Sequence, residues 1–514
     1  MKSLLLLALS LVSVAAGSAR PPNIILILAD DLGYGDIGPF GQKTIRTPTL
    51  DRLAAEGMKF TRHYSGSPVC APARCVLLTG RHPGHAFIRD NKEVGDWYSG
   101  LGQMPLPEGG PGIASALKSA GYATGAFGKW GLGGVGSSGD PLRQGFDEFF
   151  GFNDQRQAHN YYPQYLNDGA GRLLLPGNIN VAQEAGALLP AGSDANDPAS
   201  YAGFTGGQYA PDLCLDRALQ FIRDNKGKPF FLFYPTTVPH LALQVPGESL
   251  AEYRGKLDDT PYTGGKGVGA DGYFPHQYPR AAYAAMITRM DRDIGRIVHL
   301  VEELGLEGDT IFIFTSDNGA PHPLAGTDPD YFKSNGDLRG YKGEIYEGGV
   351  REPLIVRWKG RVPADTTSDL VTGFEDWMPT LLELAGATNH LPESADGISF
   401  APALLGRPQE QRPFLYREFH GHGGQQSVLA GDWKLVRRNL LETPGNPAVP
   451  AAELYNLASD PLEKINVASG NPGIVARLEK ILIEQHAPSP EFPFPILDRP
   501  SGTSGGGSNT FPNN

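Results

Sequence analysis

NIILILADD, residues Asn23–Asp31, is a continuous run of mostly branched apolar residues that ends in two aspartates. Apolar runs without alternation are typical of strands that are covered on both faces, as in parallel sheets. Three further runs of this kind lie far apart in the chain, at Tyr122–Phe127, Pro229–Tyr234 and Thr310–Thr315. Because helical patterns separate them, the sequence predicts an α/β fold with a large, mostly parallel sheet between helices.

The domain organisation follows from where this alternating pattern stops. Helical patterns lie between the predicted strands, at Thr47–Gly57, Gly112–Ala120 and Arg280–Leu304. From about Leu391 the chain instead carries short strand-like segments, such as Trp433–Arg437, and an amphipathic helical pattern around Ile474–Gln485. We therefore expect an α/β domain over residues 20–390, with a surface insertion at 169–207, and a smaller C-terminal α+β domain over residues 391–490.

Both ends of the chain have the composition of segments outside a folded domain. Lys2 precedes a short apolar run, Leu4–Ala16, and then small residues, which is the pattern of a secretory signal peptide over residues 1–19. The run is too short to span a membrane comfortably. We predict a periplasmic or secreted protein with no membrane contact after signal cleavage. The Gly/Ser-rich segment 501–514 is predicted to be a disordered tail.

Composition and charge argue against several classes of function. The chain has 514 residues, with 44 Lys+Arg against 56 Asp+Glu, so its formal net charge is −12. A net-acidic chain without a long basic run is a poor candidate for binding nucleic acid. Three cysteines, Cys70, Cys75 and Cys214, are too few for a disulfide framework. Any function must therefore come from sites on a large globular scaffold.

Polar residues follow all four predicted strands. They are Asp30 and Asp31, Lys129, His240, and Asp317 with Asn318. The carboxyl ends of parallel strands meet at one edge of a sheet, so we expect these side chains to lie together. Three converging carboxylates repel one another unless a cation lies between them, and oxygen ligands favour Ca²⁺ or Mg²⁺ over Zn²⁺. Asp-Asp and Asp-Asn pairs are also ordinary turn residues, and only their occurrence at two strand ends favours a metal site.

The segment SPVCAPARCVLLTGR, Ser67–Arg81, carries the most specific motif. Pro72 and Gly80 frame a predicted short helix that starts just beyond Cys70. The free amides at this helix end favour an anion or a developing negative charge, and Arg74, one turn further on, can point back to the same group. A nucleophile at position 70 would therefore face an anionic substrate. A small buried thiol is the alternative interpretation of Cys70.

The pattern Cys70-x-Pro72-x-Arg74 followed by LLTGR resembles the signature of the type I sulfatases of the alkaline-phosphatase superfamily. Other motifs of that family occur in order, at Asn23–Asp36, Gly121–Gly133, Thr315–Gly319, Gly340–Pro353 and Glu453–Ala468. The resemblance runs from Asn23 to about Ala468. It implies an alkaline-phosphatase-like fold and an arylsulfatase-like enzyme that releases sulfate from an ester. The exported bacterial members that the chain resembles act on sulfated glycans, so a sulfated carbohydrate or aryl sulfate is the implied substrate.

The resemblance also implies roles for individual residues. Ca²⁺, or Mg²⁺ as the alternative, would be held by Asp30, Asp31, Cys70, Asp317 and Asn318. A formylglycine-generating enzyme would convert Cys70 to Cα-formylglycine, and Arg74 would hold its hydrate in place. Lys129 and Lys342 would bind the sulfate oxygens, and His240 would lie by the leaving-group oxygen. One hydroxyl of the hydrate would attack sulfur, and loss of a proton from the other would expel sulfate and restore the aldehyde.

One motif departs from the family pattern. The usual GKWHLG reads Gly128-Lys129-Trp130-Gly131-Leu132-Gly133 here, so the histidine that contacts the second hydroxyl of the hydrate in the family is missing. We hypothesise that His159, in an aromatic loop downstream, replaces it. A hydrogen-bonded loop histidine or a substrate contact is the equal alternative for His159.

Two other functions remain open at this point. A phosphate or phosphonate ester hydrolase would use a similar metal and nucleophile, and a Ca²⁺-dependent glycan-binding protein would carry an unconverted Cys70. If the sulfated substrate is a glycan, Tyr161, Tyr162 and Trp97 could line a sugar subsite, although aromatic residues in loops more often serve packing.

Overall fold

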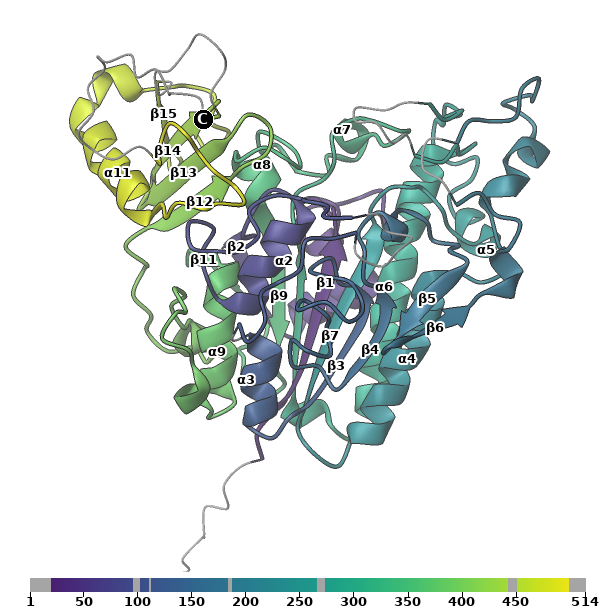
Figure 1. The fold of residues 1–514 in the computed structure, drawn as a ribbon, viewed down its shortest axis with the longest axis horizontal. Coiled ribbons are helices and arrows are strands. Elements are labelled where there is room, and N and C mark those ends of the chain that lie inside the picture. The colour runs from purple at the N-terminus through teal and green to yellow at the C-terminus, as the bar shows by residue number, and fades with distance from the viewer. Residues whose placement is uncertain are drawn as a thin grey trace, which may run out of the picture.

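The computed structural model describes residues 20–95, 102–110, 112–183, 187–265, 273–441 and 451–498. The predicted signal peptide, 1–19, and the predicted tail, 501–514, lie outside these described residues. Helices surround one large sheet, and a second, smaller sheet lies at one end of the molecule (Figure 1). None of the helices in the described ranges has the length and apolar character that a membrane span requires.

The large sheet of the described chain has eleven strands. Ten follow the order β10-β2-β9-β8-β1-β7-β3-β4-β5-β6, and β11 pairs with β2. Their bounds are β1 Asn23–Asp30, β2 Met58–Tyr64, β3 Ala123–Lys129, β4 Glu148–Phe152, β5 Tyr165–Asp168, β6 Gly171–Leu174, β7 Phe230–Pro239, β8 Thr310–Ser316, β9 Arg351–Arg357, β10 Thr366–Ser368 and β11 Thr372–Gly373.

The four strands predicted from apolar runs, β1, β3, β7 and β8, are neighbours at the centre of this sheet. All three of their pairings are parallel, and Leu26 of β1 lies between Phe233 of β7 and Ile313 of β8. Ile25 and Leu26 point to opposite faces and belong to different hydrophobic clusters. Both faces of β1 are therefore covered, which explains why its sequence does not alternate.

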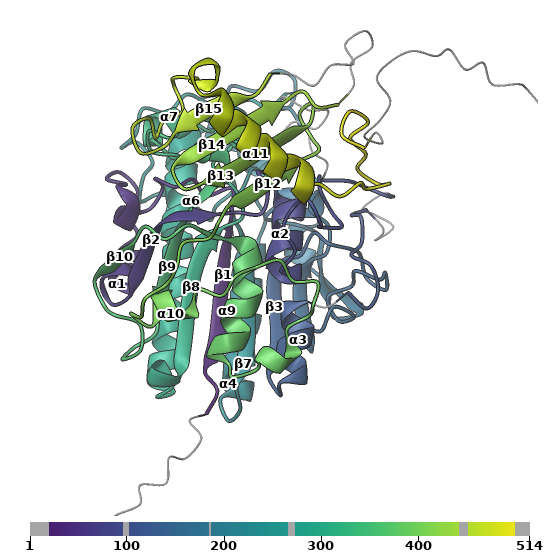
Figure 2. The ribbon, with the colours of Figure 1, turned by 90° about the vertical axis from the view of Figure 1, so that its left-hand side faces the viewer.

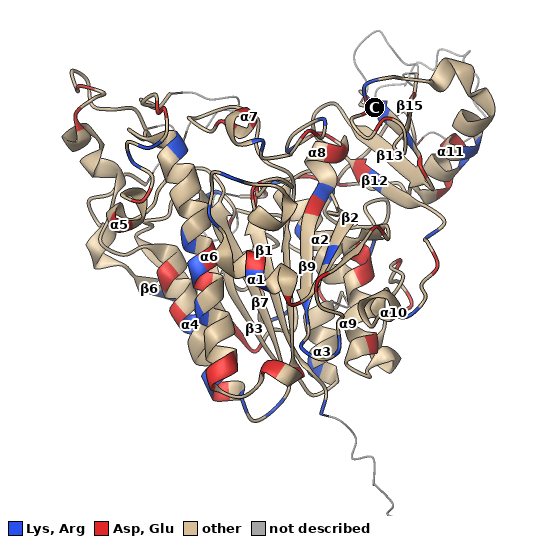
Figure 3. Cartoon of the chain, turned by 180° about the vertical axis from the view of Figure 1, so that it is seen from behind, with Lys and Arg blue, Asp and Glu red and all other residues tan. Residues whose placement is uncertain are grey.

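Helices cover both faces. Helices α1, α4 and α6 pack on one face, and α2, α3 and α9 pack on the other. The helices of the described chain are α1 Pro48–Ala55, α2 Cys70–Thr79, α3 Ile113–Ser119, α4 Ala210–Asn225, α5 Gly247–Leu250, α6 Pro279–Glu303, α7 Pro329–Phe332, α8 Glu347–Val350, α9 Trp377–Leu384, α10 Ala401–Leu404 and α11 Pro472–Gln485. Lys/Arg and Asp/Glu are interspersed along α4 and α6 (Figure 3), and Arg289 pairs with Asp212 at 2.7 Å between them.

The sheet also contains antiparallel strands that the apolar runs did not predict. Strand β9 runs antiparallel to both β2 and β8, and the hairpin β5–β6 continues the other edge beyond β4. The expectation of a mostly parallel sheet between helices is confirmed, with these strands as its antiparallel parts.

The smaller sheet is fully antiparallel. Its strands are β12 Leu415–Phe419, β13 Gln425–Ala430, β14 Trp433–Arg438 and β15 Glu453–Asn456, in that order. Helix α11 lies across it (Figure 2), and its buried Leu478 and Leu482 pack on Val428 and Leu435. The strand predicted at Trp433–Arg437 and the helix predicted at Ile474–Gln485 are both found here, so the expected C-terminal α+β element is confirmed.

His486, just after α11, joins this sheet to the segment that follows. Its Nδ1 lies 2.6 Å from Glu418 Oε2, and its Nε2 lies 2.8 Å from Asp498 Oδ1. Burial alone would lower the pKa of His486, but hydrogen bonds to the two carboxylates raise it above the usual value. A raised folded-state pKa means that the charged histidine stabilises the fold below about pH 6.5, and that this contribution is lost as pH rises through the folded-state pKa.

We therefore expect His486→Gln to destabilise the protein by about 1–3 kcal/mol near pH 5.5 and by much less near pH 9. Thermal unfolding of both proteins at the two pH values measures the difference. An equal loss of stability at the two pH values would contradict a charged His486.

Candidate functional site

The ends of the central strands bring together the residues that follow them. Ala29 of β1 pairs with Ser316 of β8, and Asp30 pairs with Pro239 of β7. The backbone amide of Asp317 then donates to the Ala29 carbonyl at 3.0 Å. Residues from β1, β7 and β8 therefore meet at one edge of the sheet, as expected from the rule that parallel strands place their carboxyl ends together.

The acidic side chains at this edge are fully buried and linked to one another. Asp30 and Asp317 are 0% exposed and Asp31 is 1% exposed. The Asp31 amide donates to Asp317 Oδ1 at 3.1 Å, and Asn318 Nδ2 donates to Asp31 Oδ1 at 2.8 Å. Asn318 Oδ1 is buried and accepts no hydrogen bond from any described residue. A buried acceptor without a donor is costly, so this oxygen is suited to bind a cation.

Cys70 lies beside these acidic residues but comes from helix α2 rather than from a strand end. It is the first residue of α2, after an extended Val69, and Gly80 ends the helix in the left-handed conformation. The helix therefore starts at Cys70 itself and not, as predicted, just beyond it. Pro72 is the third helical residue, a position where its missing N–H costs nothing because the first-turn amides have no intrahelical partner.

The Cys70 sulfur lies among charged groups. Its Sγ is 3.5 Å from Asp30 Oδ1, 3.6 Å from Lys129 Nζ and 3.5 Å from Lys342 Nζ. One ligand atom from each of Asp30, Asp31, Cys70 and His240 lies within 4.8 Å of the others. Asp317 is not a member of this group: its Oδ2 accepts hydrogen bonds from Arg74, and its Oδ1 accepts one from the Asp31 amide. The other two cysteines are buried and unpaired, as is Cys70.

Three cations hold the carboxylates. Lys129 Nζ lies 2.6 Å from Asp30 Oδ2, Lys342 Nζ lies 2.8 Å from Asp31 Oδ1, and Arg74 donates to Asp317 Oδ2 through Nη2 at 2.8 Å. Lys342 comes from the loop before α8. Its own amide donates to the Ala320 carbonyl, and the next amide donates to the Pro68 carbonyl, so backbone hydrogen bonds fix this loop against the segment before Cys70.

Two of these acids, Asp30 and Asp317, have opposite pKa shifts. Burial would raise the pKa of Asp30, but Lys129, His240, Arg74 and Lys342 together hold it well below its usual value. Burial and the charge of Asp30 raise the pKa of Asp317 to about 7, against the effect of Arg74. Burial and the neighbouring Asp30 therefore disfavour the ionised form of Asp317.

His240 and His159 stack on each other. Their ring centroids lie 4.6 Å apart, with an interplanar angle of 18°. His240 Nδ1 lies 2.5 Å from the Leu241 carbonyl, and its Nε2 lies 3.0 Å from Lys342 Nζ. Burial and the nearby lysines hold the pKa of His240 well below its usual value, which leaves a neutral ring with Nδ1–H donating to the carbonyl. His159 reaches the site through this stacking and has no described contact with Cys70.

Cys70, Asp31 and Lys342 open into one cavity of about 470 Å³, which we call the Cys70 cavity. It is also lined by the two stacked histidines and Tyr273, by Phe419 at the end of β12, and by His422 in the loop that follows β12. The volume is in the range of small-ligand sites. Residues from both sheets therefore form the wall that a substrate would contact.

The expected aromatic subsite is not formed by the tyrosines. Tyr161 and Tyr162 are 0% and 2% exposed, and the Tyr161 hydroxyl lies 2.7 Å from the His240 carbonyl and 2.5 Å from the Thr237 carbonyl. Both are core residues, and Tyr161 supports the His240 segment through these hydrogen bonds. Trp97 lies outside the described residues.

The glycine at position 131 leaves space that another side chain takes. Gly131 has a φ of 78°, and a Cβ placed there would lie 2.8 Å from Gln155 Nε2. Gln155 is 5% exposed, its Nε2 finds no acceptor among the described residues, and it lines the Cys70 cavity. Gln155 belongs to no motif in the sequence. The only available signal was the gap at Gly131.

The family of the chain follows from its match to known family models. Residues 22–387 match the family model described as "Sulfatase". The chain belongs to the sulfatase family. Residues 341–487 of this sulfatase also match the model described as "N-sulphoglucosamine sulphohydrolase, C-terminal". The family resemblance drawn from the ordered motifs is confirmed.

Relatives with known names support the same assignment. The sulfatase is 33% identical to human arylsulfatase A, over 90% of this chain and 87% of that protein. It is 32% identical to the N-acetylgalactosamine-6-sulfatase of the dog, Canis lupus familiaris, over 80% and 72% of the two chains. Among solved structures, Ps i-CgsB in complex with k-i-k-neocarrahexaose matches with a TM-score of 0.71 and 26% identity, over 91% and 94% of the chains. The protein is therefore an enzyme that hydrolyses sulfate esters.

Proposed function

We propose that this sulfatase removes sulfate from a sulfated carbohydrate, with residue 70 as the covalent nucleophile. The observation that carries the proposal is the position of the Cys70 sulfur, within 3.6 Å of Asp30, Lys129 and Lys342. An anionic group bound there would meet two ammonium groups. The name of one relative, N-acetylgalactosamine-6-sulfatase, and the k-i-k-neocarrahexaose bound to Ps i-CgsB support a sugar as the esterified alcohol.

Conversion of Cys70 to Cα-formylglycine is part of this proposal. Burial raises the pKa of the Cys70 thiol to about 12, against the effect of the two lysines. An unconverted Cys70 would therefore be a neutral thiol at pH 7, and a neutral thiol is a poor nucleophile. An aldehyde hydrate at this position needs no thiolate. A formylglycine-generating enzyme is the partner that this chemistry requires, and export to the periplasm or medium would follow it.

A divalent cation fits the acidic side of the site. Asp30, Asp31, Asp317 and Asn318 would hold it together with residue 70, because the Asn318 Oδ1 has no donor and Asp317 has a raised pKa. Carboxylate and amide oxygens favour Ca²⁺, with Mg²⁺ as the alternative. When bound, such an ion would offset negative charge on the sulfate group in the transition state.

The surrounding residues then have definite tasks. Lys129 and Lys342 bind sulfate oxygens, and Arg74 fixes residue 70 one turn earlier in α2. One hydroxyl of the hydrate attacks sulfur while the sulfur–oxygen bond to the sugar breaks. Lys342 Nζ lies 3.0 Å from His240 Nε2, and a proton that Lys342 donates passes through this pair to the leaving oxygen. Loss of the second hydroxyl's proton then expels sulfate and restores the aldehyde.

A direct test compares sulfate and phosphate release from matched aryl esters, followed by monosaccharides sulfated at defined hydroxyls. We expect sulfate release from the aryl sulfate and from at least one sulfated sugar, with much slower phosphate release. Faster phosphate release would favour a phosphoesterase, and sugar binding without turnover by a Cys70 thiol would favour a binding protein.

His159 is proposed to take the second hydroxyl's proton in place of the missing family histidine. Burial and the neighbouring His240 hold the pKa of His159 well below its usual value, so its ring is neutral at pH 7. His159→Ala should slow turnover by about 10²-fold or more and leave sulfate on residue 70. Mass spectrometry of the residue-70 peptide after mixing with aryl sulfate measures this. Turnover close to that of the exposed control His299→Ala would show that the assignment is wrong.

A further inference from the structure

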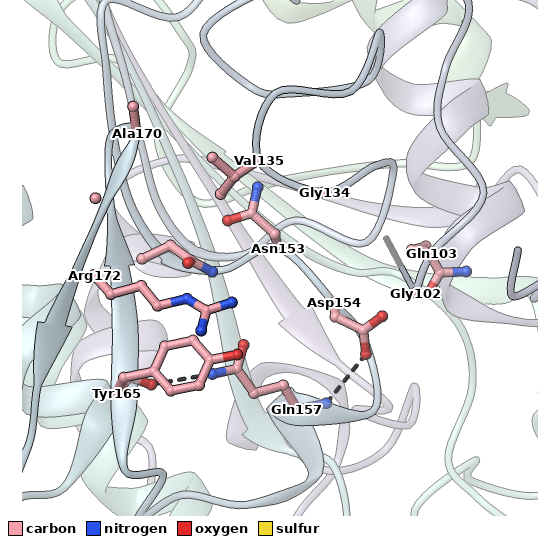
Figure 4. A pocket seen from close by; sticks show the side chains of 12 residues that line it. Gly102, Gln103, Gly134, Val135, Asn153, Asp154, Gln157, Tyr165, Ala170 and Arg172 are labelled. Carbon is pink, nitrogen blue, oxygen red and sulfur yellow. Dashed lines mark hydrogen bonds between the residues drawn. The ribbon is translucent and has the colours of Figure 1, made fainter. Parts of the chain in front are cut away.

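A second cavity adjoins the Cys70 cavity. It has a volume of about 240 Å³, and we call it the Asn153 cavity; Figure 4 shows its lining side chains, including Gln103, Asn153, Asp154, Gln157 and Arg172. Gln103 lines both cavities. The loop after β4 divides them, because Asn153 and Asp154 line the Asn153 cavity and the next residue, Gln155, lines the Cys70 cavity.

The dividing loop presents polar atoms that have no partner. Asn153 Oδ1 and Asp154 Oδ2 are buried and accept no hydrogen bond from the described residues, and the two side chains are 4% and 6% exposed. The other oxygen of Asp154 is fully used, since Oδ1 accepts from the amides of Arg156 at 2.7 Å and Gln157 at 3.2 Å. A buried acceptor without a donor costs free energy comparable to a lost hydrogen bond. Two such acceptors beside one cavity indicate a ligand that brings hydroxyl donors.

Arg172 adds a positive charge to the same cavity. It belongs to β6, its guanidinium lies 4.2 Å from the centroid of the Tyr165 ring, and no acidic residue in the described chain forms a salt bridge with it. The stacking keeps the guanidinium in place while its N–H groups stay available. A sulfate or carboxylate is the group that such an arginine binds best.

We propose that the Asn153 cavity is a second sugar subsite, which binds the residue adjoining the sulfated one in an oligosaccharide. Asn153 and Asp154 accept hydrogen bonds from its hydroxyls, and Arg172 binds an anionic substituent on it. The inference rests on the proposed carbohydrate sulfatase function and adds that the preferred substrate is a charged oligosaccharide rather than a monosaccharide.

The test compares three variants on short and long substrates. Asp154→Asn keeps an oxygen for the two loop amides but replaces the free acceptor with a donor, and Arg172→Gln removes the charge. Arg223→Gln, at an exposed position on α4 outside both linings, is the matched control. Substrates are an aryl sulfate, a sulfated monosaccharide, and the corresponding tetrasaccharides with and without a second charged group.

We expect wild type to have a higher kcat/KM for the charged tetrasaccharide than for the monosaccharide. Asp154→Asn should lower kcat/KM about tenfold for both tetrasaccharides, and Arg172→Gln should do so only for the charged one, with aryl sulfate turnover unchanged. The inference is wrong if wild type shows no preference for tetrasaccharides, or if either variant changes kcat/KM equally for all substrates or for none. Failure of wild type to release sulfate from any sugar while it cleaves the aryl sulfate would instead contradict the proposed carbohydrate substrate.

Discussion

Replacing Cys70 with alanine is expected to lower sulfate release by at least about 10³-fold, because the covalent route is then closed. Cys70→Ser should behave differently. A serine hydroxyl that takes up sulfate forms an ordinary sulfate ester, which cannot collapse to an aldehyde. We therefore expect at most one sulfate per protein molecule to be transferred and retained by Cys70→Ser.

Cys75→Ala is the matched control for both variants. Cys75 lies in the same helix, is fully buried and is unpaired, yet it does not line the Cys70 cavity. This variant should keep its activity and lose only stability, by about 1 kcal/mol. Sulfate release from an aryl sulfate, measured with folded protein in each case, distinguishes the loss of activity expected for the Cys70 variants from the retained activity expected for Cys75→Ala. Multiple turnovers by Cys70→Ala would contradict a nucleophile at position 70.

Asp317→Asn is expected to weaken calcium binding by about 100-fold and to lower activity at subsaturating calcium. The substitution removes a negative charge while it keeps the shape of the side chain. Chelation of the wild type should have the same effect on activity, with recovery when calcium is restored. Calorimetric titration with Ca²⁺ and then Mg²⁺ measures the affinity directly and identifies the ion that the site prefers.

The matched control here is Asp293→Asn, in the middle of α6. Asp293 is buried like Asp317, and burial together with Asp212 raises its pKa to about 7, so loss of its charge is tolerated. Asp293→Asn should therefore leave the calcium affinity unchanged. Equal affinity in wild type and Asp317→Asn would show that Asp317 does not bind the ion.

The central strands could be predicted because each is apolar on both faces. Burial dictates that pattern locally, and the rule for parallel strands then places Asp30, Lys129, His240 and Asp317 at one edge without further information. The strands that were missed have a different environment. Met58–Tyr64 has half-buried polar positions, and Arg351–Arg357 begins with two charged residues and a proline.

The parts of the site that come from loops depend on tertiary contacts. Lys342 was found only through the family motif, because hydrogen bonds to Ala320 and Pro68 position it rather than any strand. Gln155 carries no signal of its own, and its importance follows from the space beside Gly131. The sequence left two roles open for Tyr161, because an aromatic residue in a loop has the same pattern whether it faces a ligand or the core.

The most direct test of the account is the mass of the tryptic peptide His63–Arg74 from active enzyme produced together with its maturation enzyme. We predict the mass of an aldehyde at position 70, in which oxygen has replaced H₂S relative to cysteine. A fully active preparation whose peptide retains the intact thiol would contradict it.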